Sequence, residues 1–245
     1  MMQENSANPY ALGAPQVAAY ATDSDRMTFI RRTYAHLTGA IIALIAVEAF
    51  LFKVVPAETM EALVVRMTSG YGWLIVLGAF MLVSWVARGW ATSGGPKAMQ
   101  YAGLGLYVVA QAVILLPLLY ICINVLGEPN LPIMAALITA MCFVGLTAFV
   151  FMSGADLSGM GKYLAIGGIA AMAVIVAGIL FGFSLGLWFT GLMIVLACGY
   201  ILYDTSNIML HYDTSQHVAA ALALFASVVL LFWYVLQLLM SLQRD

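Results

Sequence analysis

One carboxylate in this sequence follows a long apolar segment and has other polar side chains at helical spacing around it. Asp204 comes directly after the uncharged residues 186–203. Tyr200 lies four residues before it, and Asn207 and His211 lie three and seven residues after it. Positions i, i+4, i+7 and i+11 share one face of an α-helix. A polar face on a membrane helix normally lines a cavity or contacts another helix. The spacing indicates a polar face that lines a cavity or contacts another helix, or a carboxylate that only marks the membrane surface.

Two further charged residues are candidates for a site inside the membrane. Arg88 ends an apolar segment at the membrane face where Asp204 is expected, so the geometry allows an Arg88–Asp204 contact. Glu48 lies 14 residues into the first apolar segment, about 21 Å from its start at 1.5 Å per residue. An intramembrane carboxylate is a functional candidate by default. For Glu48 we favour the simpler interpretation, in which it pairs with Lys53 or is hydrated from outside.

No metal, cofactor or catalytic motif is expected. His211, Asp213 and His217 lie in one short segment, but three mixed ligands without cysteine are a weak zinc signal, and a solvated loop is the better interpretation. Phosphate-binding, nucleophile-elbow and zinc-protease motifs are all missing from the sequence. The three cysteines lie in apolar segments at spacings that match neither a zinc site nor a disulfide framework, and we interpret them as buried thiols: Cys122, Cys142 and Cys198. The sequence thus predicts a protein that is not an enzyme.

The composition identifies the environment of these residues. Of the 245 residues, 64% are hydrophobic and 8% are charged, against roughly 25% charged residues in a typical soluble domain. So few charges could not cover the surface of a soluble globule, and intrinsic disorder requires low hydrophobicity. A net charge of −2 gives no basic surface for nucleic acid. The composition predicts an all-α polytopic protein whose partner is the lipid bilayer.

The distribution of charges predicts seven transmembrane helices. A spanning helix needs about 20 apolar residues, and residues 163–203 form one uncharged stretch of 41, about 60 Å as a single helix. It must therefore fold back, and the glycine-rich residues 182–186 supply the reversal. We expect a polar cytosolic tail at 1–30 and one transmembrane domain at 31–245, with a kink at Pro117. The predicted spans are 34–52, 71–87, 97–123, 131–152, 163–181, 186–203 and 217–243.

Lysine and arginine positions predict the orientation. With the N-terminus inside, six of these residues fall in cytosolic segments and three outside, and an excess of Lys and Arg marks the cytosolic side. The inside set is Arg26, Arg31, Arg32, Arg88, Lys97 and Lys162, and the outside set is Lys53, Arg66 and Arg244. The bias favours a cytosolic N-terminus and, with seven spans, an external C-terminus.

The last third of the chain resembles a known family. The run Gly199-Tyr200-Ile201-Leu202-Tyr203-Asp204-Thr205-Ser206-Asn207-Ile208, followed by a short loop and the span around residues 221–225, is similar to the Bax inhibitor-1 family. Arg31-Arg32-Thr33-Tyr34, at the start of the first span, fits the same family. Within the family the chain looks most like the bacterial YccA branch and is related to YetJ. The resemblance implies a Bax inhibitor-1-like bundle of seven helices in a bacterial inner membrane.

The resemblance implies two functions of different classes. In the YetJ branch, two aspartates near the cytosolic end of the pore share a proton and close a pH-sensitive calcium leak with the help of an arginine. Asp204 matches the first aspartate, and Arg88 is a plausible match for the arginine. The second aspartate falls on Ser227, and a carboxylate beside a hydroxyl lacks the coupling of two like charges. The departure puts the usual pH gate in doubt.

The YccA branch implies the other function. Its members bind the membrane AAA+ protease FtsH, modulate its proteolysis, and tend to lack the second carboxylate. A polar N-terminal tail in the cytosol suits engagement by that protease. On the resemblance we therefore rank modulation of an FtsH-type protease, in membrane-protein quality control, ahead of a calcium or cation leak.

Overall fold

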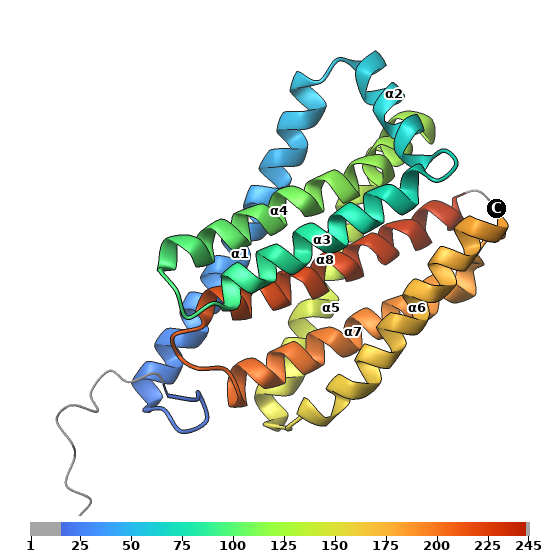
Figure 1. Ribbon diagram of the computed structural model, residues 1–245. Coiled ribbons are helices and arrows are strands. Elements are labelled where there is room, and N and C mark those ends of the chain that lie inside the picture. Colours follow the sequence, from blue (N-terminus) through green and yellow to red (C-terminus); the bar gives the residue numbers. More distant parts are fainter. Residues whose placement is uncertain (1–15, 244–245) are drawn as a thin grey trace, which may run out of the picture.

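The computed structural model describes residues 16–243, which form a bundle of helices (Figure 1). Seven helical segments within that range are long and apolar enough to cross a membrane, which confirms the predicted fold class and span count. Helical spanning segments satisfy every backbone hydrogen bond internally, as the water-free hydrocarbon requires. The bounds are α1 Asp23–Val54, α2 Ala57–Thr68, α3 Gly72–Thr92, α4 Lys97–Tyr120, α5 Leu131–Ser153, α6 Gly161–Phe181, α7 Gly186–Leu210 and α8 His217–Leu242, with a π-helical turn at Ile121–Val125 and a 3₁₀ turn at Ser158–Met160.

The last helix forms the centre of the bundle. α8 packs against α1, α3, α4, α5 and α7, and Figure 1 shows it between the α3–α4 pair and α7. In its most apolar window 72% of the residues are buried, against 11% in the window of α6, which packs mainly on α7. The small residues 219–221 of α8 are buried and let neighbouring helices approach closely in lipid. We call the end of the bundle where α1 begins the N-terminal end, and the end where α8 finishes the C-terminal end.

The first helix begins earlier than the sequence indicates. Its first residue is Asp23, so residues 23–30 of the expected tail are helical. Thr22 caps the helix by accepting a hydrogen bond from the backbone N–H of Asp25 at 3.2 Å, and such a cap is worth about 1 kcal/mol. Residues 1–15 of the expected tail lie outside the described residues.

The segment before α1 closes the N-terminal end beside the connection between α7 and α8. The backbone N–H of Ala18 donates to the carbonyl of Tyr212 at 2.8 Å, and the N–H of Thr214 donates to the carbonyl of Gln16 at 3.0 Å. Ala18 is fully buried. The chain therefore ties residues 16–18 to the 211–216 loop, a contact that neither segment indicates on its own.

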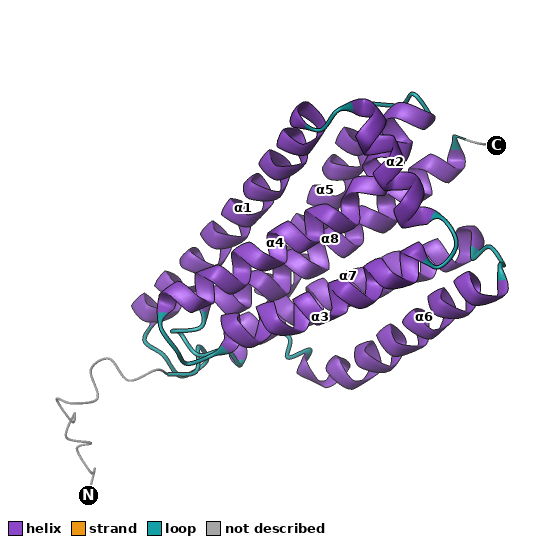
Figure 2. Ribbon diagram, turned by 45° about the horizontal axis from the view of Figure 1, so that its top comes forward, coloured by secondary structure: helices purple, strands orange, loops and turns teal. Residues whose placement is uncertain are grey.

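The connection between the first two spans contains a helix that the search for apolar spans misses. α2 has only 12 residues and packs on α3 and α4 at the C-terminal end (Figure 2). Its buried residues are Met60, Val64 and Met67, whose i, i+4, i+7 spacing gives one apolar face. That spacing, after Pro56, is the sequence signal for this amphipathic helix.

The structure defines the two irregularities predicted from the sequence, at Pro117 and at residues 182–186. α4 continues through Pro117, and its hydrogen bonding changes to a π-helical turn from Ile121. The predicted reversal at 182–186 is present: Gly182 and Gly186 adopt φ angles of 72° and 66°, which favour glycine. α7 then runs seven residues beyond the predicted end of its span, to Leu210.

The glycines of the spans have two different environments. A Cβ on Gly103 would lie 2.6 Å from the carbonyl oxygen of Ala87 and 2.9 Å from the backbone nitrogen of Ala91, because α3 and α4 are in close contact there. A Cβ on Gly168 would lie 2.6 Å from the hydroxyl of Tyr200. Gly105 and Gly145 would meet nothing within 4 Å. Close helix packing thus requires a glycine at only part of this set.

This difference predicts opposite outcomes for one substitution at two positions. Gly103→Ala forces the backbones of α3 and α4 apart, and we expect a loss of about 1–3 kcal/mol in the free energy of unfolding. Gly105→Ala lies on the same helix, meets no atom and gains helix propensity, so it should be neutral or stabilising. Thermal unfolding in detergent measures both. Equal stability of the two variants would contradict the close α3–α4 contact.

Candidate functional site

Asp204 meets its hydrogen-bond partner on the central helix. α7 continues as a regular helix past Asp204 to Leu210, so the carboxylate projects sideways from a helix wall instead of ending a span. The hydroxyl of Ser227 on α8 donates to Oδ2 of Asp204 at 2.5 Å. Ser227 is buried. Ser227, which the resemblance matches to a second aspartate, therefore contacts Asp204 through a hydroxyl and not through a carboxylate.

The Asp204–Ser227 pair lies at one end of a long cavity. This cavity has a volume of about 1590 Å³ and is bordered by α3, α4, α6, α7 and α8. Both Gly186 and Asp204 line it, and these residues are about 27 Å apart along α7 at helical rise. The hydrocarbon core is about 30 Å thick. The cavity thus follows α7 over nearly the full depth of an apolar core, and its walls are mostly apolar side chains.

Arg88 lines the same cavity without forming a salt bridge to Asp204. No Arg88–Asp204 pair occurs within 4.0 Å among the described residues. The guanidinium lies over the ring of Tyr107 at 5.7 Å from its centroid, an arrangement that stabilises a cation over an aromatic face. The sequence allows the two groups to meet, but the structure brings them only to one cavity, and Ser227 is the direct partner of Asp204.

The polar stripe on α7 separates into two groups. Tyr200 lines the cavity with Asp204, and its hydroxyl donates to the carbonyl of Leu164 on α6 at 2.8 Å. Asn207 is half-buried, does not line the cavity, and accepts the backbone N–H of His211 at its carbonyl. Only the first two members of the stripe therefore belong to the site.

The remaining residues of the 211–217 segment have separate partners. The His211 ring contacts Oδ1 of Asp156 at 3.2 Å, and His217 lies against His36, with ring centroids 5.0 Å apart. In the part of the chain that the structure describes, no three histidine, cysteine or acidic residues form a metal-binding group. The segment is therefore a folded connection in which His211 is exposed and His217 is buried.

Two ionisable groups outside the spans, one beside this connection and one within it, have shifted pKa values. The backbone N–H and hydroxyl of Ser158, together with the His211 ring, lower the pKa of Asp156 to about 2. Burial, with a smaller contribution from the charge of Asp204, raises the pKa of Tyr212 to about 12. Asp156 is therefore an anion, and Tyr212 a neutral phenol, over the physiological pH range.

Glu48 is buried away from this cavity. It is 8% exposed, and neither carboxylate oxygen has a hydrogen-bond partner. Lys53 is exposed and forms no salt bridge with it, so the pairing that we favour from the sequence is wrong, and so is hydration from outside.

The orphaned oxygens of Glu48 predict a stabilising substitution. Burying a polar group without a partner costs about 1–3 kcal/mol, so Glu48→Met should raise the free energy of unfolding by a similar amount. Glu61→Met, at an exposed glutamate of α2, is the matched control and should change it by less than about 0.5 kcal/mol. Denaturant unfolding in detergent measures both. A destabilised Glu48→Met variant would show that a bound ion or water pairs with the carboxylate.

Three polar cavity residues escape a search based on charge. Ser84 on α3, Gln111 on α4 and Thr190 on α7 all line the cavity. The hydroxyl of Ser84 is buried without a partner. An uncharged polar residue within an apolar span is a functional signal of the same kind as a carboxylate. Gln111, the amide in the middle of its span, is the member that sequence reasoning could have found.

The arrangement suits attraction and passage of a cation better than tight binding or catalysis. Calcium sites use six to eight oxygen ligands, whereas this cavity offers a single carboxylate, and its other polar side chains are spread along the wall. Because the Arg88 guanidinium lines the same cavity, the Asp204 carboxylate provides only a weak attractive step for a cation. Conduction needs such a step, because an ion must be able to leave.

The sequence is similar to known proteins over almost its whole length. The family described as Inhibitor of apoptosis-promoting Bax1 matches residues 26–244. The chain belongs to the Bax inhibitor-1 family. This membership confirms the resemblance, while the finer assignment to the YccA branch stays a prediction.

Proteins from three different organisms are similar to this chain. It is 28% identical to Bax inhibitor 1 of Schizosaccharomyces pombe, over 93% of this chain and 81% of that protein. It is 26% identical to Protein LIFEGUARD 3 of Arabidopsis thaliana, over 89% of this chain and 86% of the other. An uncharacterized protein of Neisseria meningitidis is 24% identical over 58% of this chain and 63% of its own length. The chain is therefore a multi-pass membrane protein of this family.

Proposed function

We propose that this member of the Bax inhibitor-1 family is a cation leak, with calcium as its substrate ion. The observation that carries the proposal is the cavity along α7, which ends at the Asp204 carboxylate. The hydroxyl of Ser227 donates a hydrogen bond to one oxygen of that carboxylate. The 211–216 loop and residues 16–18 cover the N-terminal end of the bundle. The arrangement supports a closed state, in which a cation enters from the C-terminal end and stops at Asp204.

The proposal places the N-terminal end of the bundle in the cytosol of a bacterial cell. Lysines and arginines of the described residues support this orientation. Six of them lie at the N-terminal end of the bundle, and two, Lys53 and Arg66, lie at its C-terminal end. Arg244, the third residue expected outside, lies beyond the described residues. Positive residues favour the cytosolic side. The Asp204–Ser227 pair then closes the cavity on the cytosolic side.

Calcium flux into proteoliposomes tests the leak. Liposomes that contain the purified full chain and an entrapped calcium dye should take up calcium faster than protein-free liposomes. Flux equal to that of protein-free liposomes at every pH from acid to alkaline would overturn the proposal. A matched chain with Asp204→Asn distinguishes passage through this cavity from leakage around a poorly reconstituted protein.

Modulation of an FtsH-type protease is the other function that the resemblance implies. The tail expected to engage the protease includes residues 1–15, which lie outside the described residues, so the contacts reported above do not bear on this function. A pull-down for FtsH beside the flux measurement separates the two functions. Association with FtsH and no calcium flux would restore protease modulation to first place, and deleting the residues before Arg26 should then abolish the effect on degradation.

A further inference from the structure

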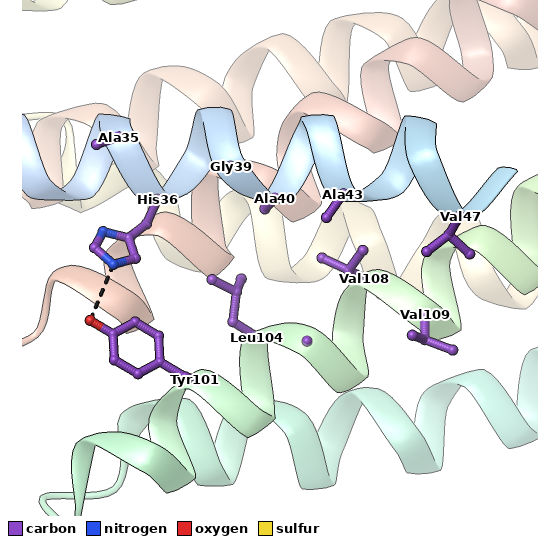
Figure 3. A pocket seen from close by; sticks show the side chains of 11 residues that line it. Ala35, His36, Gly39, Ala40, Ala43, Val47, Tyr101, Leu104, Val108 and Val109 are labelled. Carbon is purple, nitrogen blue, oxygen red and sulfur yellow. Dashed lines mark hydrogen bonds between the residues drawn. The ribbon is translucent and has the colours of Figure 1, made fainter. Parts of the chain in front are cut away.

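A second groove lies on the outer surface of the bundle, between α1 and α4. It has a volume of about 490 Å³ and shares no lining residue with the Asp204 cavity. Figure 3 shows its floor of small side chains, with Gly39 and Ala43 on α1, and with Val108 and Val109 facing them from α4. Gly39, Gly105 and Val109 are exposed, so the groove opens toward the lipid and not toward the bundle interior.

A histidine–tyrosine pair closes the groove at the N-terminal end of the bundle. Nδ1 of His36 lies 2.6 Å from the carbonyl oxygen of Arg32, which can only accept, so this nitrogen carries the hydrogen. Nε2 lies 3.2 Å from the hydroxyl of Tyr101, within hydrogen-bond distance (Figure 3). The rings also stack, with centroids 5.4 Å apart. The pair fixes α1 against α4 and gives an otherwise apolar groove one polar end.

Two cations lie one helical turn beyond this pair. Arg32 precedes His36 by four residues on α1, and Lys97 precedes Tyr101 by four residues on α4. This spacing places each cation on the helix face that borders the groove. Both side chains are exposed, and no acidic group of the described chain lies within salt-bridge distance of either. His217 is within electrostatic reach of both. The polar end of the groove therefore carries two uncompensated positive charges.

We propose that this groove binds one anionic phospholipid, with an acyl chain along its floor and the phosphate between Arg32 and Lys97. The lining runs from Ala35 to Val47 along α1, about 18 Å at helical rise, which is close to one leaflet of a core about 30 Å thick. Basic pockets between helices at a membrane surface are known to bind anionic headgroups. The start of α4 at Lys97 adds the positive end of a helix dipole.

Charge argues against a second copy of the chain as the occupant. Two protomers related by a two-fold axis along the membrane normal would present the same groove to each other. Arg32 and Lys97 of both protomers would then meet at one depth, and like charges there repel. A phosphate removes this repulsion, whereas a second copy doubles it.

Native mass spectrometry of the purified full chain in detergent tests the proposal. The probes are dioleoyl phosphatidylglycerol, dioleoyl phosphatidylcholine and glycerol phosphate without acyl chains. We expect phosphatidylglycerol to bind at least about tenfold more tightly than phosphatidylcholine, and glycerol phosphate not to bind at the same concentration. Equal binding of the two lipids would overturn the proposal, as would a lipid-independent dimer.

Two pairs of variants locate the site. Arg32→Gln with Lys97→Gln should weaken phosphatidylglycerol binding by about tenfold, and Gly105→Leu should do the same by filling the groove. Arg31→Gln with Lys162→Gln removes two cations from the same end of the bundle and should change binding by less than about twofold.

Gly145→Leu controls for the added side chain. Like Gly105, Gly145 has no neighbour within 4 Å of a new Cβ, but it lies on α5, away from the groove. A control variant that lost as much lipid as its partner would overturn the assignment to the α1–α4 groove.

Discussion

We expect Asp204→Asn to lower calcium flux through the reconstituted protein by at least about tenfold, and Ser227→Ala to raise it. The asparagine amide still accepts the Ser227 hydroxyl and keeps the shape of the side chain, so the variant removes only the charge that attracts a cation into an apolar cavity. One charge at 4 Å is worth about 4 kcal/mol at an effective dielectric constant of 20, and about 1.4 kcal/mol corresponds to a tenfold change in rate. Ser227→Ala keeps the charge and frees the carboxylate oxygen that now accepts at 2.5 Å.

Opposite changes in calcium flux from substitutions at two residues in direct contact distinguish gating from a loss of folding. A misfolded variant loses flux whichever residue is changed. Glu58→Gln removes the same charge from an exposed position on α2 and should leave flux unchanged. Ser241→Ala makes the same substitution at the other end of the cavity and should also be silent. A fall in flux with both Asp204→Asn and Ser227→Ala would contradict a gating role for their hydrogen bond.

Ser227→Asp should give the leak a pH dependence that the parent chain lacks or shows only weakly. Ser227 borders a cavity, so the longer side chain has room, and it places a second carboxylate beside Asp204. Two carboxylates at this distance cannot both ionise cheaply and titrate as one unit that shares a proton. The pair that shares one proton carries one negative charge, and the fully deprotonated pair carries two. Flux should therefore rise as the pH rises through the upper titration of the pair, and fall at acid pH, where both carboxylates are protonated.

Ser227→Asn is the matched control, because it has the size of aspartate without the second charge. Its flux should vary with pH no more than that of the parent. Calcium uptake across a pH series, with the dye calibrated at each pH, measures all three proteins. A folded Ser227→Asp variant whose pH profile matches that of Ser227→Asn would show that position 227 does not control the ion path. If the protein acts instead through an FtsH-type protease, this substitution leaves association with the protease intact.

The elements of this protein that depend on local composition could be read from the sequence. Each span is set by a run of apolar residues about as long as the hydrocarbon core is thick, so the seven spans and the reversal at 182–186 follow from charge positions and glycine alone. The starts at Lys97, Leu131, Gly186 and His217 agree with the structure to the residue. Local signals that a search for apolar runs ignores were missed, as with the cap at Thr22 and the amphipathic face of α2.

The partners of each polar side chain could not be read in this way, because they depend on how helices rotate and pack against one another. Asp204 stands out in the sequence, but only the contact between α7 and α8 gives it Ser227 as a partner, and only the packing of α3 and α4 places Arg88 over Tyr107 instead of against Asp204. Glu48 shows the same division. Its depth in the membrane follows from counting residues, whereas its isolation depends on which helix face is buried.

A bilayer constrains the length and polarity of each span, but it is equally apolar around every helix, so hydropathy alone does not determine which faces meet. The sequence by itself determined the class, the spans and the candidate carboxylates of this protein. Only the tertiary structure decided which of them line a common cavity and what each one contacts.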